Sequence, residues 1–250
     1  MVDGAALEKR WAEMPRGFES HPLRGGGVKM TNKYSFPPRL NEWVNKFFKG
    51  LKDEPKFRKD TIGHSEAVQM LNRQVFSRLD ELRLEEFRHC ITETGNVMKV
   101  KPNHWESILN EIDNDFPRVK RYLKFIRDFD GKTADMQKLL DRGDSLHIRG
   151  AGLFFITQLL AGAHLDQYVV FHDNMYEALR HLEVIDIGAK IDTGSRYVVI
   201  NAICKWLYEE KFKQRMRVSY KLGLQSVHNF LWHYHYHQIK GKGRWWKEDC

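Results

Sequence analysis

Apolar side chains recur every three or four residues along most of this chain, and that spacing restricts its fold more than any other feature. Stripes of this kind run through residues 40–48, 65–79, 82–91, 102–112, 116–126, 197–212 and 222–236. Runs rich in β-branched and aromatic residues, the usual mark of strands, are short and sparse. The sequence therefore predicts an all-α fold made of a single multi-helix domain.

The composition changes along the chain and suggests three parts. Residues 1–30 hold Gly25-Gly26-Gly27 and no periodicity, so they are expected to be disordered or to lie upstream of the true start codon, near Met30. Residues 31–239 form the helical domain, with lobes of about 31–130 and 131–239 as an alternative to one unit. Residues 240–250 form a basic, aromatic tail.

The formal charge of +8 is concentrated at the C-terminal end. Residues 205–250 hold ten Lys/Arg against four Asp/Glu, whereas residues 31–204 hold 26 against 25. A nearly neutral body with a basic end is typical of a module that binds a polyanion, although a basic solvated surface has the same composition.

Cysteine usage and hydropathy indicate where such a chain would work. Cys90, Cys204 and Cys250 form neither a Cys-x-x-Cys motif nor a disulfide framework. The sequence has no apolar run long enough to cross a bilayer. We expect a cytoplasmic protein that does not bind membranes.

Local signals predict several element boundaries. Ser65 is a candidate N-cap, and Gly95-Asn96 is expected to stop the helix before it. The run from Tyr197 to Phe212 is interpreted as one long helix. Tyr168–Phe171 could form a short strand, a loop or a buried helical turn.

The turn Arg149-Gly150-Ala151-Gly152 is the main candidate for binding. Two glycines allow positive φ and let backbone N–H groups converge on an anion. The helix expected from Leu153 would direct its N-terminal dipole to the same place, and Arg149 could pair with a phosphate. The alternative is an ordinary helix–helix turn.

Asp173 is the candidate catalytic carboxylate. As a general base or as a stabiliser of an oxocarbenium ion it would need partial burial beside an extruded base. The competing interpretation is an N-cap for the helix over 174–182, since Asp is among the best caps.

Histidines and tryptophans are dense near the C-terminus. His233, His235 and His237 alternate, which could indicate a metal site, but only the first and third would share a helix face, and no cysteine or acidic partner sits nearby at ligand spacing. Stacking or hydrogen bonding is the favoured role. In the tail, the residues suited to phosphate contacts and to stacking on bases or lipid headgroups are Lys240, Lys242, Arg244, Trp245, Trp246 and Lys247. The alternative is a flexible end whose tryptophans fold onto the body.

The turn, the apolar helix Leu153–Leu160 and Asp173 together resemble the helix–hairpin–helix DNA glycosylase superfamily over about 40 residues. The resemblance implies that the amides of residues 149–152 grip one DNA strand and that Asp173 serves glycosidic chemistry. Bifunctional members place a lysine just after the hairpin, where this chain has Phe154 and Phe155. Lyase chemistry through a Schiff base is therefore not expected.

A second resemblance covers more of the chain. Residues 150–182, Tyr197 and Val227–Trp232 (VHNFLW) resemble a helical domain found with modified-cytosine restriction ATPases and with related stand-alone defence proteins. The chain departs from that group by lacking a nucleotide-binding loop and by having His228 where an acidic residue is common. Hydrolysis of ATP or GTP by this chain is therefore not expected.

These observations predict a DNA-binding helical domain, without catalysis of its own, linked to defence or mobile elements. Two alternatives remain: a monofunctional DNA glycosylase that uses Asp173, and an interaction module for a partner nuclease or ATPase. No cofactor and no metal site are predicted.

Overall fold

The computed structural model describes residues 37–98, 102–184, 193–216 and 222–241, with the side chains of 96–98, 102–104 and 216 left out. The α-helices are α2 (Pro38–Asp53), α3 (Pro55–Gln74), α4 (Leu84–Met98), α5 (Pro102–Asn114), α6 (Phe116–Arg127), α7 (Thr133–Leu140), α8 (Leu153–Ala163), α9 (Asp173–His181), α10 (Thr193–Leu207), α11 (Lys213–Met216) and α12 (Gln225–Tyr234). A 3₁₀ turn, η1 (Phe76–Arg78), and two π-helical segments, η2 (Tyr208–Phe212) and η3 (His235–Ile239), complete them.

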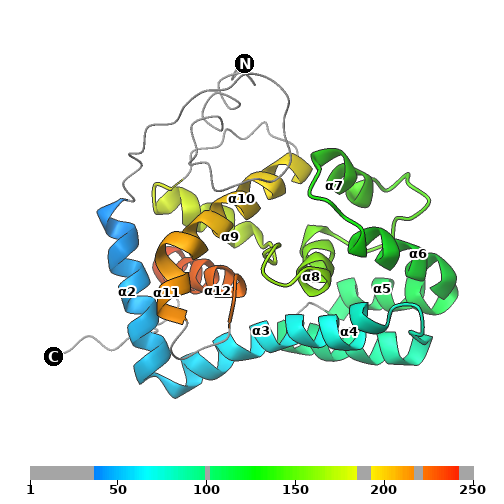
Figure 1. The fold of residues 1–250 in the computed structure, drawn as a ribbon, viewed down its shortest axis with the longest axis horizontal. Helices are drawn as coiled ribbons and strands as arrows, with labels where there is room; N and C mark the ends of the chain where they lie inside the picture. The colour runs from blue at the N-terminus through cyan, green and yellow to red at the C-terminus, as the bar shows by residue number, and fades with distance from the viewer. Residues whose placement is uncertain (1–36, 99–101, 185–192, 217–221, 242–250) are drawn as a thin grey trace, which may run out of the picture.

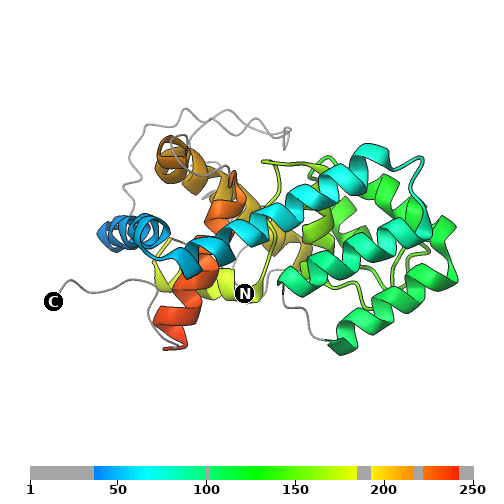
Figure 2. The same ribbon diagram turned by 90° about the horizontal axis from the view of Figure 1, so that it is seen from below.

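The prediction of an all-α fold is confirmed, since the described residues contain helices and no strand. Helix α3 is the spine of the molecule. It contacts α2, α4, α8 and α12, and Figures 1 and 2 show it passing from the group around α2 and α12 to the group around α4, α5 and α6.

One hydrophobic core joins the two groups. It includes side chains from Leu40 in α2 to Tyr234 in α12, and it contains residues on both sides of Gly131. Near α2 the core is mostly aromatic: the ring of Phe47 packs edge-on against Phe57 and Phe230 at centroid distances of 5.6 and 5.7 Å. The helical stripes read from the sequence are the parts of the chain that build this core.

Two expected helix boundaries are wrong. In each case a residue that looks like a helix start or stop signal takes part in tertiary packing within a helix. Ser65 is no N-cap: α3 begins ten residues earlier at Pro55, and Ser65 is buried in its middle. Gly95 does not stop a helix, because α4 continues to Met98. A Cβ at Gly95 would lie 2.5 Å from Cζ2 of Trp105, so glycine is there to let the indole of α5 pack closely.

The run from Tyr197 to Phe212 is helical throughout, but its winding changes. It is α-helical to Leu207 and π-helical over η2. The segment after Tyr234 changes in the same way at η3. Because a π-helical turn holds one more residue than an α-helical turn, the side chains that follow each junction are rotated around the axis.

Tyr168–Phe171 is neither strand nor helix but a buried linker between α8 and α9, here called the clamped segment. Its backbone polar groups are paired with helix side chains instead of a neighbouring strand. Two buried amides each accept from one backbone N–H and donate to one backbone C=O. The bonds run from Val169 N to Asn201 Oδ1 (2.8 Å), from Asn201 Nδ2 to Gln167 O (3.1 Å), from Val170 N to Gln225 Oε1 (3.1 Å) and from Gln225 Nε2 to Tyr168 O (2.8 Å).

Three more groups of the clamped segment are paired in the same manner. Phe171 N donates to Thr157 Oγ1 in α8 at 2.9 Å, and the hydroxyl of Tyr197 in α10 donates to Val169 O at 3.2 Å. His228 Nδ1 in α12 lies 2.7 Å from Val170 O and donates to it. Since burial of an unpaired peptide group is costly, these side chains fix α8, α10 and α12 around one strip of backbone.

We expect Asn201→Ala to unfold at a clearly lower urea concentration than the wild type. The change leaves the buried N–H of Val169 without its partner, at about 1–3 kcal/mol, and removes the bond to the C=O of exposed Gln167, which water can replace. The exposed Gln137→Ala on α7 is the matched control and should change the unfolding free energy by less than about 0.5 kcal/mol. Equal midpoints for Asn201→Ala and the wild type would contradict the clamp.

Acid should weaken the fold through His228. The pKa of His228 is lowered from an ordinary value of 6.5 to about 3, chiefly by burial and also by His64 and His172, although the hydrogen bond to Val170 O opposes the shift. Below pH 6.5 the unfolded chain takes up a proton that the folded imidazole does not bind, so this contribution to stability is complete above pH 6.5 and decreases as the pH falls toward 3.

His228→Asn keeps an N–H near the position of Nδ1 but cannot titrate. We expect its unfolding free energy to depend less steeply on pH between 6 and 4, by up to about 1.4 kcal/mol per pH unit for one proton. Urea titrations at several pH values measure both slopes. Parallel slopes would mean that His228 already binds a proton in the folded protein.

Candidate nucleic-acid interface

Arg149 and Gly150 are the corners of a turn that projects from two buried anchors. Ile148 and Ala151 are 0% and 5% exposed, and Ala151 N donates to Ile148 O at 2.9 Å. Gly150 has φ = +88°, the conformation that a type II turn requires at its third residue. Arg149 and Gly150 are both exposed. In the sequence Ile148-Arg149-Gly150-Ala151, two exposed residues lie between two buried apolar ones. This pattern therefore gives the turn a rigid tip.

This turn is the last of several successive turns in the connection from α7 to α8. Gly143 N and Leu146 N donate to the carboxylates of Asp141 and Asp144, at 2.9 and 2.8 Å. Arg118 of α6 donates from Nη1 to His147 O at 3.0 Å. The connection is thus tied down along its length, and it is longer than a direct hairpin between two helices.

The turn leads into the N-terminus of α8. Gly152 is the N-cap, is exposed, and has no heavy atom within 4 Å of the position that a Cβ would take. A glycine cap has no side-chain oxygen to accept from the first amides of α8, so the N–H groups of Leu153 and Phe154 depend on water or a ligand. The φ of −84° at Gly152 is open to any residue, so folding does not demand glycine here.

The N-terminus of α9 lies beside that of α8. The rings of Phe154 and His172 pack edge to face with centroids 5.6 Å apart, and Thr157 binds the backbone just before α9. The clamped segment is what brings these two helix starts together. Two positive helix ends at one place attract an anion more strongly than one.

Asp173 is the first residue of α9, and its side chain is exposed. His172 holds the N-cap position, so the interpretation of Asp173 as the cap is wrong by one residue; its carboxylate instead lies in the first turn, where the helix dipole favours it. Its exposure does not supply the partial burial expected of a catalytic base. The catalytic role of Asp173 stays a prediction.

The pKa of His172 is lowered, chiefly because the ring is largely buried. The neighbouring carboxylate of Asp173 opposes this shift, and His235 of η3 adds to it. His172 is therefore neutral at physiological pH and adds no positive charge to this place.

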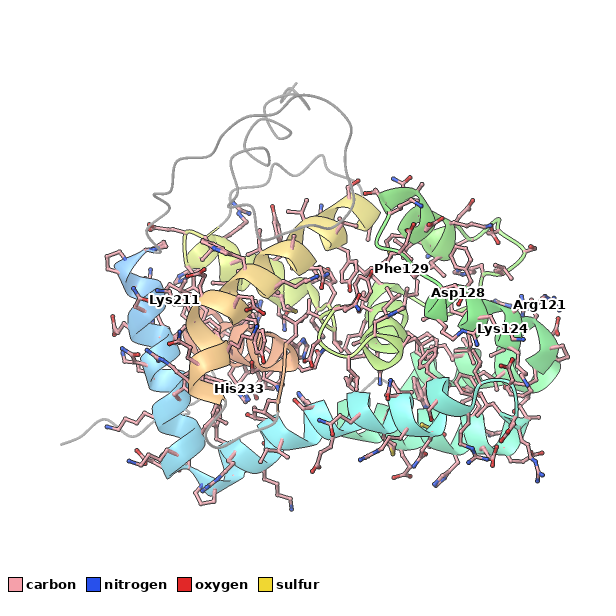
Figure 3. The ribbon with its side chains drawn as sticks, in the orientation of Figure 1. Arg121, Lys124, Asp128, Phe129, Lys211 and His233 are labelled. Atoms are coloured by element: carbon pink, nitrogen blue, oxygen red, sulfur yellow. The ribbon has the colours of Figure 1, made fainter. Side chains whose placement is uncertain are left out.

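On α6, Lys124 and Arg127 are paired with a carboxylate of the link between α3 and α4. Lys124 Nζ lies 2.9 Å from Asp80 Oδ1, and Arg127 lies 3.8 Å from the other oxygen of the same carboxylate. The hydrogen bond from Lys124 lowers the pKa of Asp80. Figure 3 labels Lys124 among the side chains of α6. These cations hold the link between α3 and α4 against α6, so we do not assign them to a ligand.

The structure places the predicted residues in two regions. Arg149–Gly152 lead into the start of α8 and Asp173 begins α9, whereas Lys240 is exposed directly after η3. Residues 1–36 and the predicted contacts Lys242, Arg244, Trp245, Trp246 and Lys247 lie outside the described residues.

The three alternating histidines point to different surroundings. His233 is buried and faces α3, where its ring lies 4.3 Å from that of Phe57. His235 is buried with Nε2 2.5 Å from Glu177 of α9, and His237 is half-buried and stacked on His233. Within the described residues, no group of three or more His, Cys, Asp or Glu side chains is arranged to hold a metal ion.

Sequence reasoning missed the side chains that hold the interface in place. Asn201, Gln225 and Thr157 look like ordinary polar residues within helices, and nothing in their spacing shows that they bind a buried loop. The stacked pair of Trp232 and Tyr236, by contrast, has the i, i+4 spacing of helical neighbours and could have been found.

Comparisons with known proteins add no relative: no family model, no curated protein and no solved structure matches this chain. In the part of the chain that the structure describes, none of the helices has the length and apolar character needed to span a bilayer.

The two glycines of the turn should respond differently to alanine. Gly150→Ala forces a residue with a Cβ to adopt φ = +88° and should cost about 1–2 kcal/mol of unfolding free energy. Gly152→Ala meets neither strain nor a steric clash and should stay within about 0.5 kcal/mol of the wild type. Urea unfolding measures both changes; the reverse order would contradict this description of the turn.

Proposed function

We propose that this chain is a DNA-binding helical module that holds a phosphate backbone at the starts of α8 and α9, without catalysis of its own. The observation that carries the proposal is the exposed, rigid turn ending in Gly152, which leaves the first amides of α8 open beside Arg149. The resemblance to helical domains of restriction ATPases and stand-alone defence proteins is the reason to suggest a role in defence or in mobile elements.

The local geometry suits a phosphate better than a bulky neutral ligand. Arg149 offers planar donors with a permanent charge, which match phosphate oxygens. Gly152 has no side chain above the first amides of α8, so a phosphate oxygen can approach them directly. Many backbone contacts of this type bind DNA independently of its sequence.

The basic C-terminal end would add affinity without specificity. Residues 205–250 carry a net charge of +6, and each phosphate that a cation neutralises releases a counterion. Asp173, exposed at the start of α9, opposes an approaching phosphate. A module built for binding alone would therefore bind DNA more tightly with asparagine at that position.

The alternative of a docking module for a nuclease or ATPase calls for a large exposed apolar patch. Among the described residues, the exposed large hydrophobic side chains are only Leu165 and Tyr236. They belong to different parts of the chain, so we do not favour this alternative.

The test compares Arg149→Gln and Gly152→Val with the wild type in binding a labelled DNA duplex by fluorescence anisotropy over a range of salt concentrations. Both variants should bind more weakly. Arg149→Gln should also reduce the slope of log K against log salt by about 0.9, the effect of one phosphate contact. Gly152→Val should keep the wild-type slope, because it blocks access to amides and removes no charge.

Arg142→Gln is the matched control, because Arg142 is an exposed cation of the same connection away from the tip. It should affect affinity less than Arg149→Gln does. Identical binding by the wild type, Arg149→Gln and Gly152→Val would remove this site from the proposal. Asp173→Asn separates binding from catalysis: tighter DNA binding supports the proposal, whereas wild-type base release from damaged or modified DNA that the variant loses supports a glycosylase.

A further inference from the structure

Arg149 is an isolated charge in a long uncharged stretch of the chain. From Ser145 to Leu165 the sequence has no other Asp, Glu, Lys or Arg. The side chain of Arg149 is exposed, and in the part of the chain that the structure describes it forms no ion pair and no ring contact. A surface that only follows phosphates usually carries several cations. The placement of one arginine by itself therefore calls for a more specific role.

The backbone on both sides of Arg149 is slender. Gly150 and Gly152 have no side chains, and Ala151 between them is buried. Ile148, on the other side of Arg149, is buried as well. The guanidinium is therefore the only exposed side chain of residues 148–152, and the tip that carries it is narrow.

Backbone hydrogen bonds fix the shape of this tip. Ala151 N donates to Ile148 O at 2.9 Å, and Gly152 N donates to Gly150 O at 3.0 Å. The positive φ of Gly150 completes the type II turn. An arginine presented on a turn that is already ordered loses less conformational entropy on binding than one on a mobile loop.

The minor groove of duplex DNA suits a tip of this shape and charge. The groove is about 6 Å wide in ordinary B-DNA. It is narrower in A-tracts, where its negative potential is stronger and attracts arginine side chains. A guanidinium is also more weakly hydrated than the ammonium group of lysine, so it loses less on leaving bulk water. One guanidinium between residues without exposed side chains can enter a groove that excludes a bulkier loop.

We propose that Arg149 inserts into the minor groove of duplex DNA, beside the phosphate held at the start of α8, and that the module prefers A-tracts. This inference rests on the proposed function and adds to it a preference for one DNA shape. Contacts to phosphates carry no sequence information directly, so the preference belongs to Arg149. The sequence is then read through the width of the groove.

The test measures the affinity of the full chain for three labelled duplexes of equal length. Their centres hold an A-tract, a run of G·C pairs or a run of inosine·cytosine pairs. Inosine lacks the amino group that guanine places in the minor groove, and it leaves the major-groove edge unchanged. The wild type should bind the A-tract and the inosine duplex about three- to tenfold more tightly than the G·C duplex.

Four variants separate insertion into the groove from charge alone. Arg149→Gln should bind all three duplexes more weakly and show no preference. Arg149→Lys keeps the charge and the salt slope but should lose most of the preference. Gly150→Asn adds a side chain beside the guanidinium at a φ that asparagine tolerates, so it should reduce the preference and leave the affinity for the G·C duplex near that of the wild type. Arg142→Gln, at an exposed cation elsewhere in the connection, should keep the wild-type preference. Circular dichroism and the urea midpoint confirm that each variant is folded.

Several results would overturn the proposal. One is equal affinity of the wild type for the A-tract and the G·C duplex, and another is a preference that Arg149→Gln retains. An inosine duplex that binds like the G·C duplex would place the preference outside the minor groove. If the wild type binds no duplex, the proposed phosphate site fails as well. If the wild type binds all three equally and Arg149→Gln binds all three more weakly, the phosphate site stands and only the insertion is wrong.

Discussion

The structure depends on the pairing of one buried strip of backbone. Residues 168–171 cross the interior between α8 and α9 with no strand beside them, so side chains must meet their N–H and C=O groups. Asn201, Gln225, Thr157, Tyr197 and His228 do so from three different helices. A loop that is satisfied in this way acts as a common template, because each of the three helices has to present a donor or an acceptor at a fixed place.

The clamped segment also determines what reaches the surface. The N–H of Phe171 is bound to Thr157 of α8. Because α9 begins only two residues later, at Asp173, its start lies beside the start of α8. The first turn of α8, with its open amides after Gly152, therefore lies next to the residue that precedes Asp173, although about twenty residues separate them in the sequence. Helix α3 also packs against two rings of α12, with Phe57 against His233 and His64 against Trp232. The proposed phosphate site thus belongs to the framework that packs around α3 and the clamped segment.

The sequence could predict the helices but not how they meet. Period 3.6 identified the helical stripes because each contributes its apolar face to the core. The helix boundaries predicted at Ser65 and Gly95 were wrong because non-local packing decides the role of a small residue. Such a residue can end a helix, or it can make room for a neighbouring side chain such as Trp105. The turn at 149–152 was recognisable from its glycines. Its partners were not, because an asparagine or glutamine within a helix looks the same whether it faces water or a buried loop.

The most direct test of the link between the clamped segment and DNA binding is amide hydrogen exchange of the full chain, measured by mass spectrometry with and without duplex DNA. If the clamp holds the two helix starts in place for a phosphate backbone, peptides over residues 168–171 exchange as slowly as the core in both conditions. Peptides over 149–155 then exchange quickly alone and slowly with DNA. Fast exchange over 168–171 in the free protein, or exchange over 149–155 that DNA leaves unchanged, would contradict it.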